Sequence, residues 1–103
     1  MPTTESKKDL EQLILRLERN HQCVLRMTKA LNSYKYEPKN YECFIKLREL
    51  KSAFSRLAQD QLSLFDEIQH QSLQFNVAAE MVEKSLREYQ ELEKTTVVYQ
   101  SEL

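Results

Sequence analysis

Hydrophobic residues recur at alternating steps of three and four along most of the chain, which is the spacing of a helix face packed against other helices. The first run begins just after Ser6, a residue type that caps helices. Its positions are Leu10, Leu13, Leu17, Asn20, Val24, Met27, Leu31 and Tyr34. Asn20 is the polar exception, and a single buried Asn in such a face fixes the register of the packed helices.

The periodicity stops in the segment from Tyr34 to Asn40. Because proline disfavours the α conformation of the residue before it, the first helix should end before Glu37. Pro38 itself suits the first turn of the next helix. The sequence therefore predicts a first helix over about residues 6–35 and a second that begins at about residue 39.

A second run of the same spacing continues from Leu47 to the last residue without a change of phase. Its apolar members include Leu47, Leu50, Phe54, Leu57, Leu64, Ile68, Phe75, Val82, Tyr89 and Leu92. Four polar residues interrupt it, namely Gln61, Gln71, Ser85 and Thr96. The pattern is weakest around residues 69–73, although this stretch contains no Gly, Pro or Asp.

Two all-α folds fit this pattern within a single domain of residues 1–103. The one we favour is a helical hairpin with a short first helix and one long second helix over about residues 39–102, since the phase is the same on both sides of the weak stretch. The alternative is a three-helix bundle with a break near residues 69–73. Both pack as coiled coils through the residues named above.

The hairpin leaves half of its second helix uncovered, because a first helix of this length reaches only the first half. Phe75, Val82, Tyr89 and Leu92 would then face water. An exposed apolar stripe of that size marks a partner surface. We therefore expect helical subunits of other proteins as partners, with a homo-oligomer as the alternative.

The amino-acid composition excludes several classes of binding site. The chain has 103 residues, of which 41% are hydrophobic and 30% charged, and it lacks glycine. Phosphate-binding loops and dinucleotide fingerprints need glycine where the backbone approaches the phosphate, so both are excluded. No stretch is apolar enough to span a bilayer, and the N-terminal residues lack the apolar core of a signal peptide. We expect a cytoplasmic protein with reduced cysteines.

Few residues are candidates for catalysis, cofactor binding or metal binding. His21 and Cys23 lie two residues apart, which places them on different helix faces. We expect His21 to be a packed structural residue and His70 to lie on the surface. Cys23 and Cys43 suit packing positions. The sequence predicts no enzyme activity, cofactor or metal.

Charge is divided unevenly between the two halves of the chain, although the formal net charge is only −1. Residues 1–56 carry an excess of Lys and Arg, and residues 57–103 an excess of Asp and Glu. Opposite charges of this kind align helices or partners. The basic residues between positions 35 and 56 alternate with Glu and do not line one helix face, so we expect no direct nucleic-acid binding.

Four short segments carry a resemblance to a known family, namely Asp9–Leu13, the Glu37-Pro38 turn, Glu67–Gln71 and Glu88–Glu93. They resemble the N-terminal coiled-coil region of the Ska family, the subunits of the spindle- and kinetochore-associated complex, and most of all its first subunit. The resemblance implies a non-enzymatic assembly subunit that oligomerises with related helical subunits, and a complex that attaches kinetochores to spindle microtubules in mitosis.

The microtubule-binding domain of that first subunit has no counterpart in these 103 residues, so the resemblance implies assembly rather than direct microtubule binding. A second function class stays open beside it. It is a compact three-helix domain of a vesicle-tethering or SNARE-regulatory protein, which would fold as a monomer.

Overall fold

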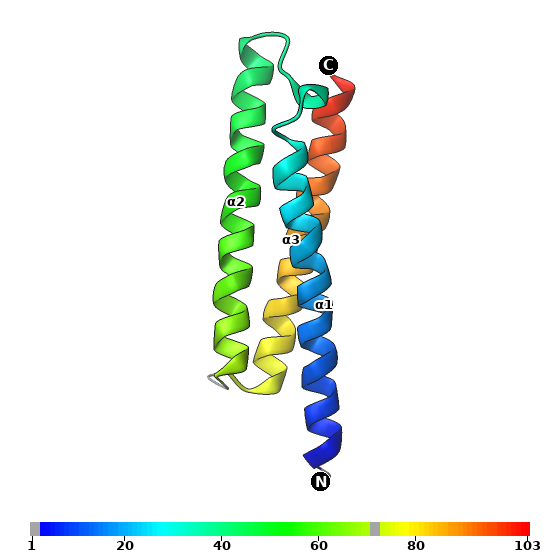
Figure 1. The fold of residues 1–103 in the computed structure, drawn as a ribbon, viewed down its shortest axis with the longest axis vertical. Coiled ribbons are helices and arrows are strands. Elements are labelled where there is room, and N and C mark those ends of the chain that lie inside the picture. Colours follow the sequence, from blue (N-terminus) through cyan, green and yellow to red (C-terminus); the bar gives the residue numbers. More distant parts are fainter. Residues whose placement is uncertain (1–2, 71–72) are drawn as a thin grey trace.

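Three helices lie side by side and form a rod of 58 × 19 × 18 Å (Figure 1). The computed structural model describes residues 3–70 and 73–103. Helix α1 spans Thr3–Ala30, α2 spans Tyr41–Gln69 and α3 spans Phe75–Ser101, and a short 3-10 turn, η1, covers Tyr34–Tyr36. Helix α2 runs antiparallel to its two neighbours, and each helix contacts both others (Figure 1). The predicted all-α class is confirmed, in the form of the three-helix alternative.

The continuous second helix that we favoured, over about residues 39–102, is wrong. Helix α2 ends at Gln69, where the backbone N–H of His70 donates to the carbonyl of Asp66 at 3.0 Å, and α3 begins at Phe75. Within the predicted break, residues 71 and 72, and with them Gln71, lie outside the described residues. Folding α3 back onto α1 and α2 buries its apolar face, which an extended helix would leave in water.

The bounds of α1 also differ from the prediction. The helix begins at Thr3, so Ser6 lies inside it instead of capping it. It ends at Ala30, earlier than residue 35, and the chain continues into η1. The 3-10 turn is held in place by α3, because the hydroxyl of Tyr99 donates to the carbonyl of Tyr36 at 2.7 Å. This contact stabilises the linker between α1 and α2, residues 31–40, against the end of α3.

Helix α2 begins with an asparagine cap two residues after the proline. The side chain of Asn40 accepts a hydrogen bond from the backbone N–H of Cys43 at 2.9 Å, which satisfies one of the free amides at the helix start. Pro38 lies before the helix, in the linker, and not in the first turn as predicted. The N-cap residue Asn40, and not Pro38, therefore marks the start of α2.

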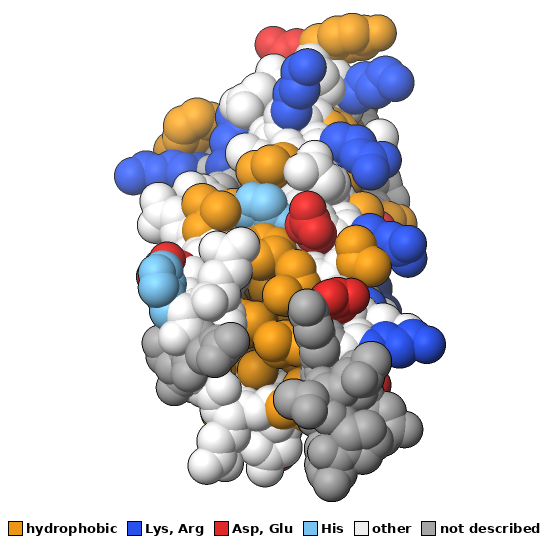
Figure 2. Space-filling model, turned by 60° about the horizontal axis from the view of Figure 1, so that its bottom comes forward, with side chains coloured by type: hydrophobic (Ala, Val, Ile, Leu, Met, Phe, Trp, Pro, Cys, Tyr) orange, Lys and Arg blue, Asp and Glu red, His pale blue; other side chains and the backbone are white. Residues whose placement is uncertain are grey.

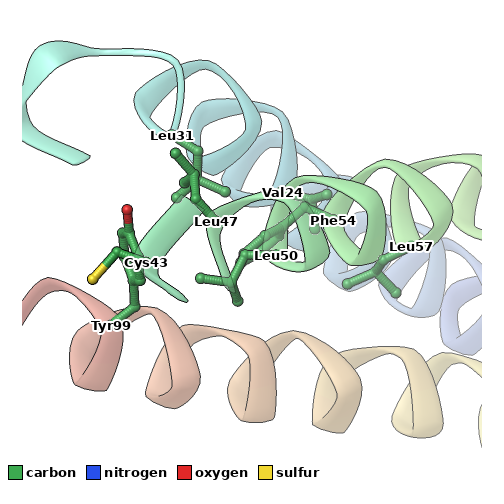
Figure 3. Packing of buried hydrophobic residues seen from close by; sticks show 8 residues of the cluster. All are labelled: Val24, Leu31, Cys43, Leu47, Leu50, Phe54, Leu57 and Tyr99. Atoms are coloured by element: carbon green, nitrogen blue, oxygen red, sulfur yellow. The ribbon is translucent and has the colours of Figure 1, made fainter. Parts of the chain in front are cut away.

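The hydrophobic core consists of two clusters, and all three helices contribute to each. The cluster near the linker is Val24, Leu31, Cys43, Leu47, Leu50, Phe54, Leu57 and Tyr99 (Figure 3). The cluster near the α2–α3 turn is Leu13, Leu17, Leu64, Ile68, Ala78 and Val82. Phe54 and Val82 are completely inaccessible to solvent. Burial of this apolar surface is the main favourable contribution to folding.

The structure buries most of the predicted packing residues. Five of these residues are half-buried at the edges of the core, namely Leu10, Asn20, Met27, Tyr89 and Leu92. The other predicted packing residues of the three α-helices are buried, with one exception. The exception is Phe75, which is 47% exposed because it is the first residue of α3 and lies beyond the end of the core. Tyr34, in η1, is exposed as well.

The apolar stripe that predicted a partner is therefore covered by the chain itself. Val82 packs in the cluster with Leu13 and Leu64, and Tyr89 and Leu92 pack against the other cluster. The expectation that these residues insert into another chain is wrong for this fold. The physical reason is again the return of α3, which lets α1 and α2 cover it.

Replacing Val82 with Glu should unfold the bundle. A carboxylate at this site would be buried without a partner, which costs about 3–5 kcal/mol or more, against a total stability of about 5–15 kcal/mol for a typical domain. The measurement is urea unfolding followed by circular dichroism. Val97→Glu is the matched control, since Val97 lies on the same helix but is 62% exposed. Equal effects of the two changes would contradict the packing described here.

Candidate functional site

A layer of hydrogen-bonded polar side chains separates the two core clusters. Its centre is Gln61 of α2, which is 1% exposed. The amide nitrogen Nε2 donates to Oδ1 of Asn20 at 2.8 Å and to Oγ of Ser85 at 3.0 Å. The amide oxygen Oε1 accepts from Nδ1 of His21 at 2.9 Å. One glutamine therefore joins all three helices.

The polar layer leaves no buried side-chain nitrogen or oxygen atom unpaired among the described residues. The ring of His21 also packs edge-on against Phe65, with 5.9 Å between ring centroids and 87° between ring planes. A shift of any helix along its axis would break these bonds inside a dry core, where an unpaired polar group is costly. The layer thus fixes the register of the three helices.

The sequence pattern identifies the residues of this layer, but it does not predict that they meet and form hydrogen bonds with one another. Asn20, Gln61 and Ser85 were recognised as polar positions in the apolar pattern, and His21 was predicted to be a packed structural residue, as it is. A signal was available in the sequence, because each of the three helices carries at least one polar interruption of its apolar pattern, and α3 carries two, Ser85 and Thr96. The meeting of the layer's residues at one level depends on the α2–α3 turn, which the sequence pattern does not reveal.

The other candidate residues do not converge on a site. Cys43 is buried in the core and Cys23 is half-buried, and both are free thiols. His70 is exposed and lies 3.2 Å from the carboxylate of Asp66. Among the side chains that the structure describes, those of residues 8–70 and 73–103, no three or more of His, Cys, Asp or Glu are arranged to hold a metal ion. None of the described helices is long and apolar enough to cross a membrane.

A long groove with an apolar floor runs between α2 and α3. It consists of three hollows of about 280, 520 and 390 Å³, in order from the α2–α3 turn toward the linker. The first two share Leu57, and the second and third share Ala53 and Leu92, so the hollows form one continuous surface. We call it the α2–α3 groove. Leu50 and Leu64 extend its floor toward the two ends.

Charged side chains of both helices line the α2–α3 groove. They are Lys46, Glu49, Arg56, Asp60, Glu67, Lys84, Arg87, Glu88, Glu91 and Glu102. Within the described residues one ion pair crosses the groove, between Nζ of Lys46 and the carboxylate of Glu102 at 3.0 Å. This hydrogen bond and the charge of Glu102 raise the pKa of Lys46. The ten residues comprise six acids and four bases, which leaves the groove with a net charge of −2.

Other exposed hydrophobic side chains lie outside the groove. Leu15 and Leu25 of α1 and Leu62 of α2 are exposed. The end of the bundle where α1 begins shows hydrophobic side chains gathered along the middle of the face (Figure 2). At the other end, the ring of Tyr41 stacks on Phe44 with 6.3 Å between centroids.

Comparison with known proteins adds no relative. No family model matches the chain, and neither the curated proteins nor the solved structures contain a match. The resemblance to the Ska family therefore stays a prediction from four short segments, and the function must be argued from the geometry of the chain itself.

Replacing Gln61 with Leu should lower the free energy of unfolding by about 1–3 kcal/mol, because it leaves the buried partners of the amide without hydrogen bonds. Chemical unfolding with far-ultraviolet circular dichroism measures the change. Gln59→Leu, on the exposed side of the same helix, should stay within about 0.5 kcal/mol. A stabilised Gln61→Leu variant would show that the polar layer is not needed.

Stability should fall as the pH rises from about 10 toward 12, in part through Tyr89. Burial and a hydrogen bond from its hydroxyl to Glu93 at 3.1 Å raise the pKa of Tyr89 from 10.0 to about 12. The unfolded chain loses the hydroxyl proton of Tyr89 at a lower pH than the folded chain does. The stabilisation is therefore complete below the pKa of the unfolded chain, and it is lost as the pH rises through the pKa of the folded chain. Urea unfolding at a series of alkaline pH values should give a shallower decline for Tyr89→Phe. Identical slopes would rule out this contribution.

Proposed function

We propose that this chain is a non-catalytic helical interaction domain, which folds by itself and binds other proteins through its outer surface. The polar layer and both core clusters draw on all three helices, so the bundle closes without a further chain. Partner binding is then an activity of the outside of the bundle and not a condition for folding.

The α2–α3 groove carries this proposal. It is long and apolar along its floor, and both sides carry charges that are mostly unpaired across it. Small-molecule sites are enclosed pockets in which a few polar groups converge on one point. A continuous groove along two helices instead has the shape and lining of a surface that receives a protein segment.

The compact bundle favours one of the two function classes expected from the sequence. A self-contained three-helix domain corresponds to the vesicle-tethering or SNARE-regulatory class, whereas the extended subunit depended on a continuous second helix and an uncovered stripe. Assembly into a Ska-type complex and a location at kinetochores and spindle stay predictions of the resemblance, as does a cytoplasmic location.

The protein should be a compact monomer of 12.3 kDa in dilute solution, with a single cooperative thermal transition. The reason is that its core is complete without a partner, and small single domains usually unfold in one step. Sedimentation equilibrium and calorimetry measure the two quantities. An obligate oligomer, or a broad transition that sharpens only when another helical subunit is added, would favour the extended assembly subunit instead.

A further inference from the structure

We propose that the α2–α3 groove binds one basic amphipathic helix of a partner protein, which packs on the bundle as a fourth helix. The proposal rests on the proposed function and names the chemistry of the partner. Two observations carry it, namely the form of the groove and the sign of its charge.

The groove has the length and relief that a helix requires. Its lining extends on α2 from Lys46 to Glu67, which is 22 residues and about 32 Å from the first to the last at the rise of an α-helix. Ala53 lies between Leu50 and Leu57 and is part of two of the three hollows, so this small side chain leaves a depression beside two large ones. Ridges of side chains on a docked helix pack into such depressions.

The charge of the groove selects the partner. Two ion pairs involve lining residues, namely Lys46 with Glu102 across the groove and Glu91 with Lys94 of the same helix. Without these paired residues the lining keeps four acids and three bases, which is a net charge of −1. Asp60, Glu67 and Glu88 form no ion pair in the described structure. A helix with Lys or Arg beside its apolar stripe would supply the missing counter-charges.

The same charge argues against other occupants. Two copies of the chain that met groove to groove would bring two acidic surfaces together, and like charges oppose such contact. Anionic lipid surfaces and nucleic acids would be repelled for the same reason. The basic helix α1 of a second copy cannot dock here through its apolar face, because Leu13, Leu17 and Val24 are buried in the core of that copy.

The test uses the full chain and two synthetic 21-residue helices as probes. Both probes carry the same stripe of Leu at alternating steps of three and four, and their flanking positions are all Lys in one and all Glu in the other. Fluorescence anisotropy of labelled probes gives the dissociation constants, at concentrations where sedimentation shows the probes to be monomeric. The Lys probe should bind at least about tenfold more tightly at low salt, and the difference should shrink as salt is added.

Ala53→Arg should weaken binding of the Lys probe at least about tenfold, because the long side chain fills the depression and adds a like charge. Ser55→Arg is the matched control, since Ser55 is exposed on the same helix and lines none of the hollows. Glu88→Lys combined with Glu91→Lys should reverse the preference of the two probes, and both positions are exposed, so the fold is retained.

Equal affinity for the two probes, a preference for the Glu probe, no saturable binding of either probe, or equal effects of Ala53→Arg and Ser55→Arg would each overturn the proposal. These outcomes are separate from failure of the proposed function. A monomer that melts cooperatively but binds neither probe remains a self-contained domain without this docking site, whereas an obligate oligomer contradicts the proposed function before any probe is added.

Discussion

The hydrogen bonds of Gln61 are the constraint on which the arrangement of the bundle depends. Apolar clusters alone would allow the helices to slide past one another, because the hydrophobic effect has no direction. A buried amide with three partners on two other helices allows one alignment. That alignment sets which residues of α2 and α3 face each other, and therefore also the shape of the groove between them.

The return of α3 changes what the chain needs from other proteins. With α3 packed on α1 and α2, the apolar residues that would otherwise require a partner are satisfied internally. The surface that remains for partners is formed by positions flanking the core, where small and charged residues mix with the edges of buried leucines. Binding through such a surface can be reversible, because the domain does not lose its fold when the partner leaves.

Charge and packing act at different places in this molecule. The core is held by apolar burial and by the hydrogen bonds of the polar layer, while the acidic, Lys and Arg residues lie on the helix edges. Exposed ion pairs such as that between Arg16 and Glu83 contribute little to stability. In the proposed interaction, the acidic excess along the groove would act in recognition, where the sign of the charge matters more than the energy of any single pair.

The sequence by itself determined the helical class, the break near Pro38 and most of the buried positions, because the apolar period of a helix and the restrictions imposed by proline are local properties. It also marked Asn20, Gln61 and Ser85 as polar interruptions. Only the tertiary structure decided that the chain turns again between Gln69 and Phe75, since the helix phase is the same on both sides and the gain from turning lies in long-range contacts. The polar layer and the groove follow from that turn, because each consists of residues that are distant in sequence and adjacent only when α3 lies against α2.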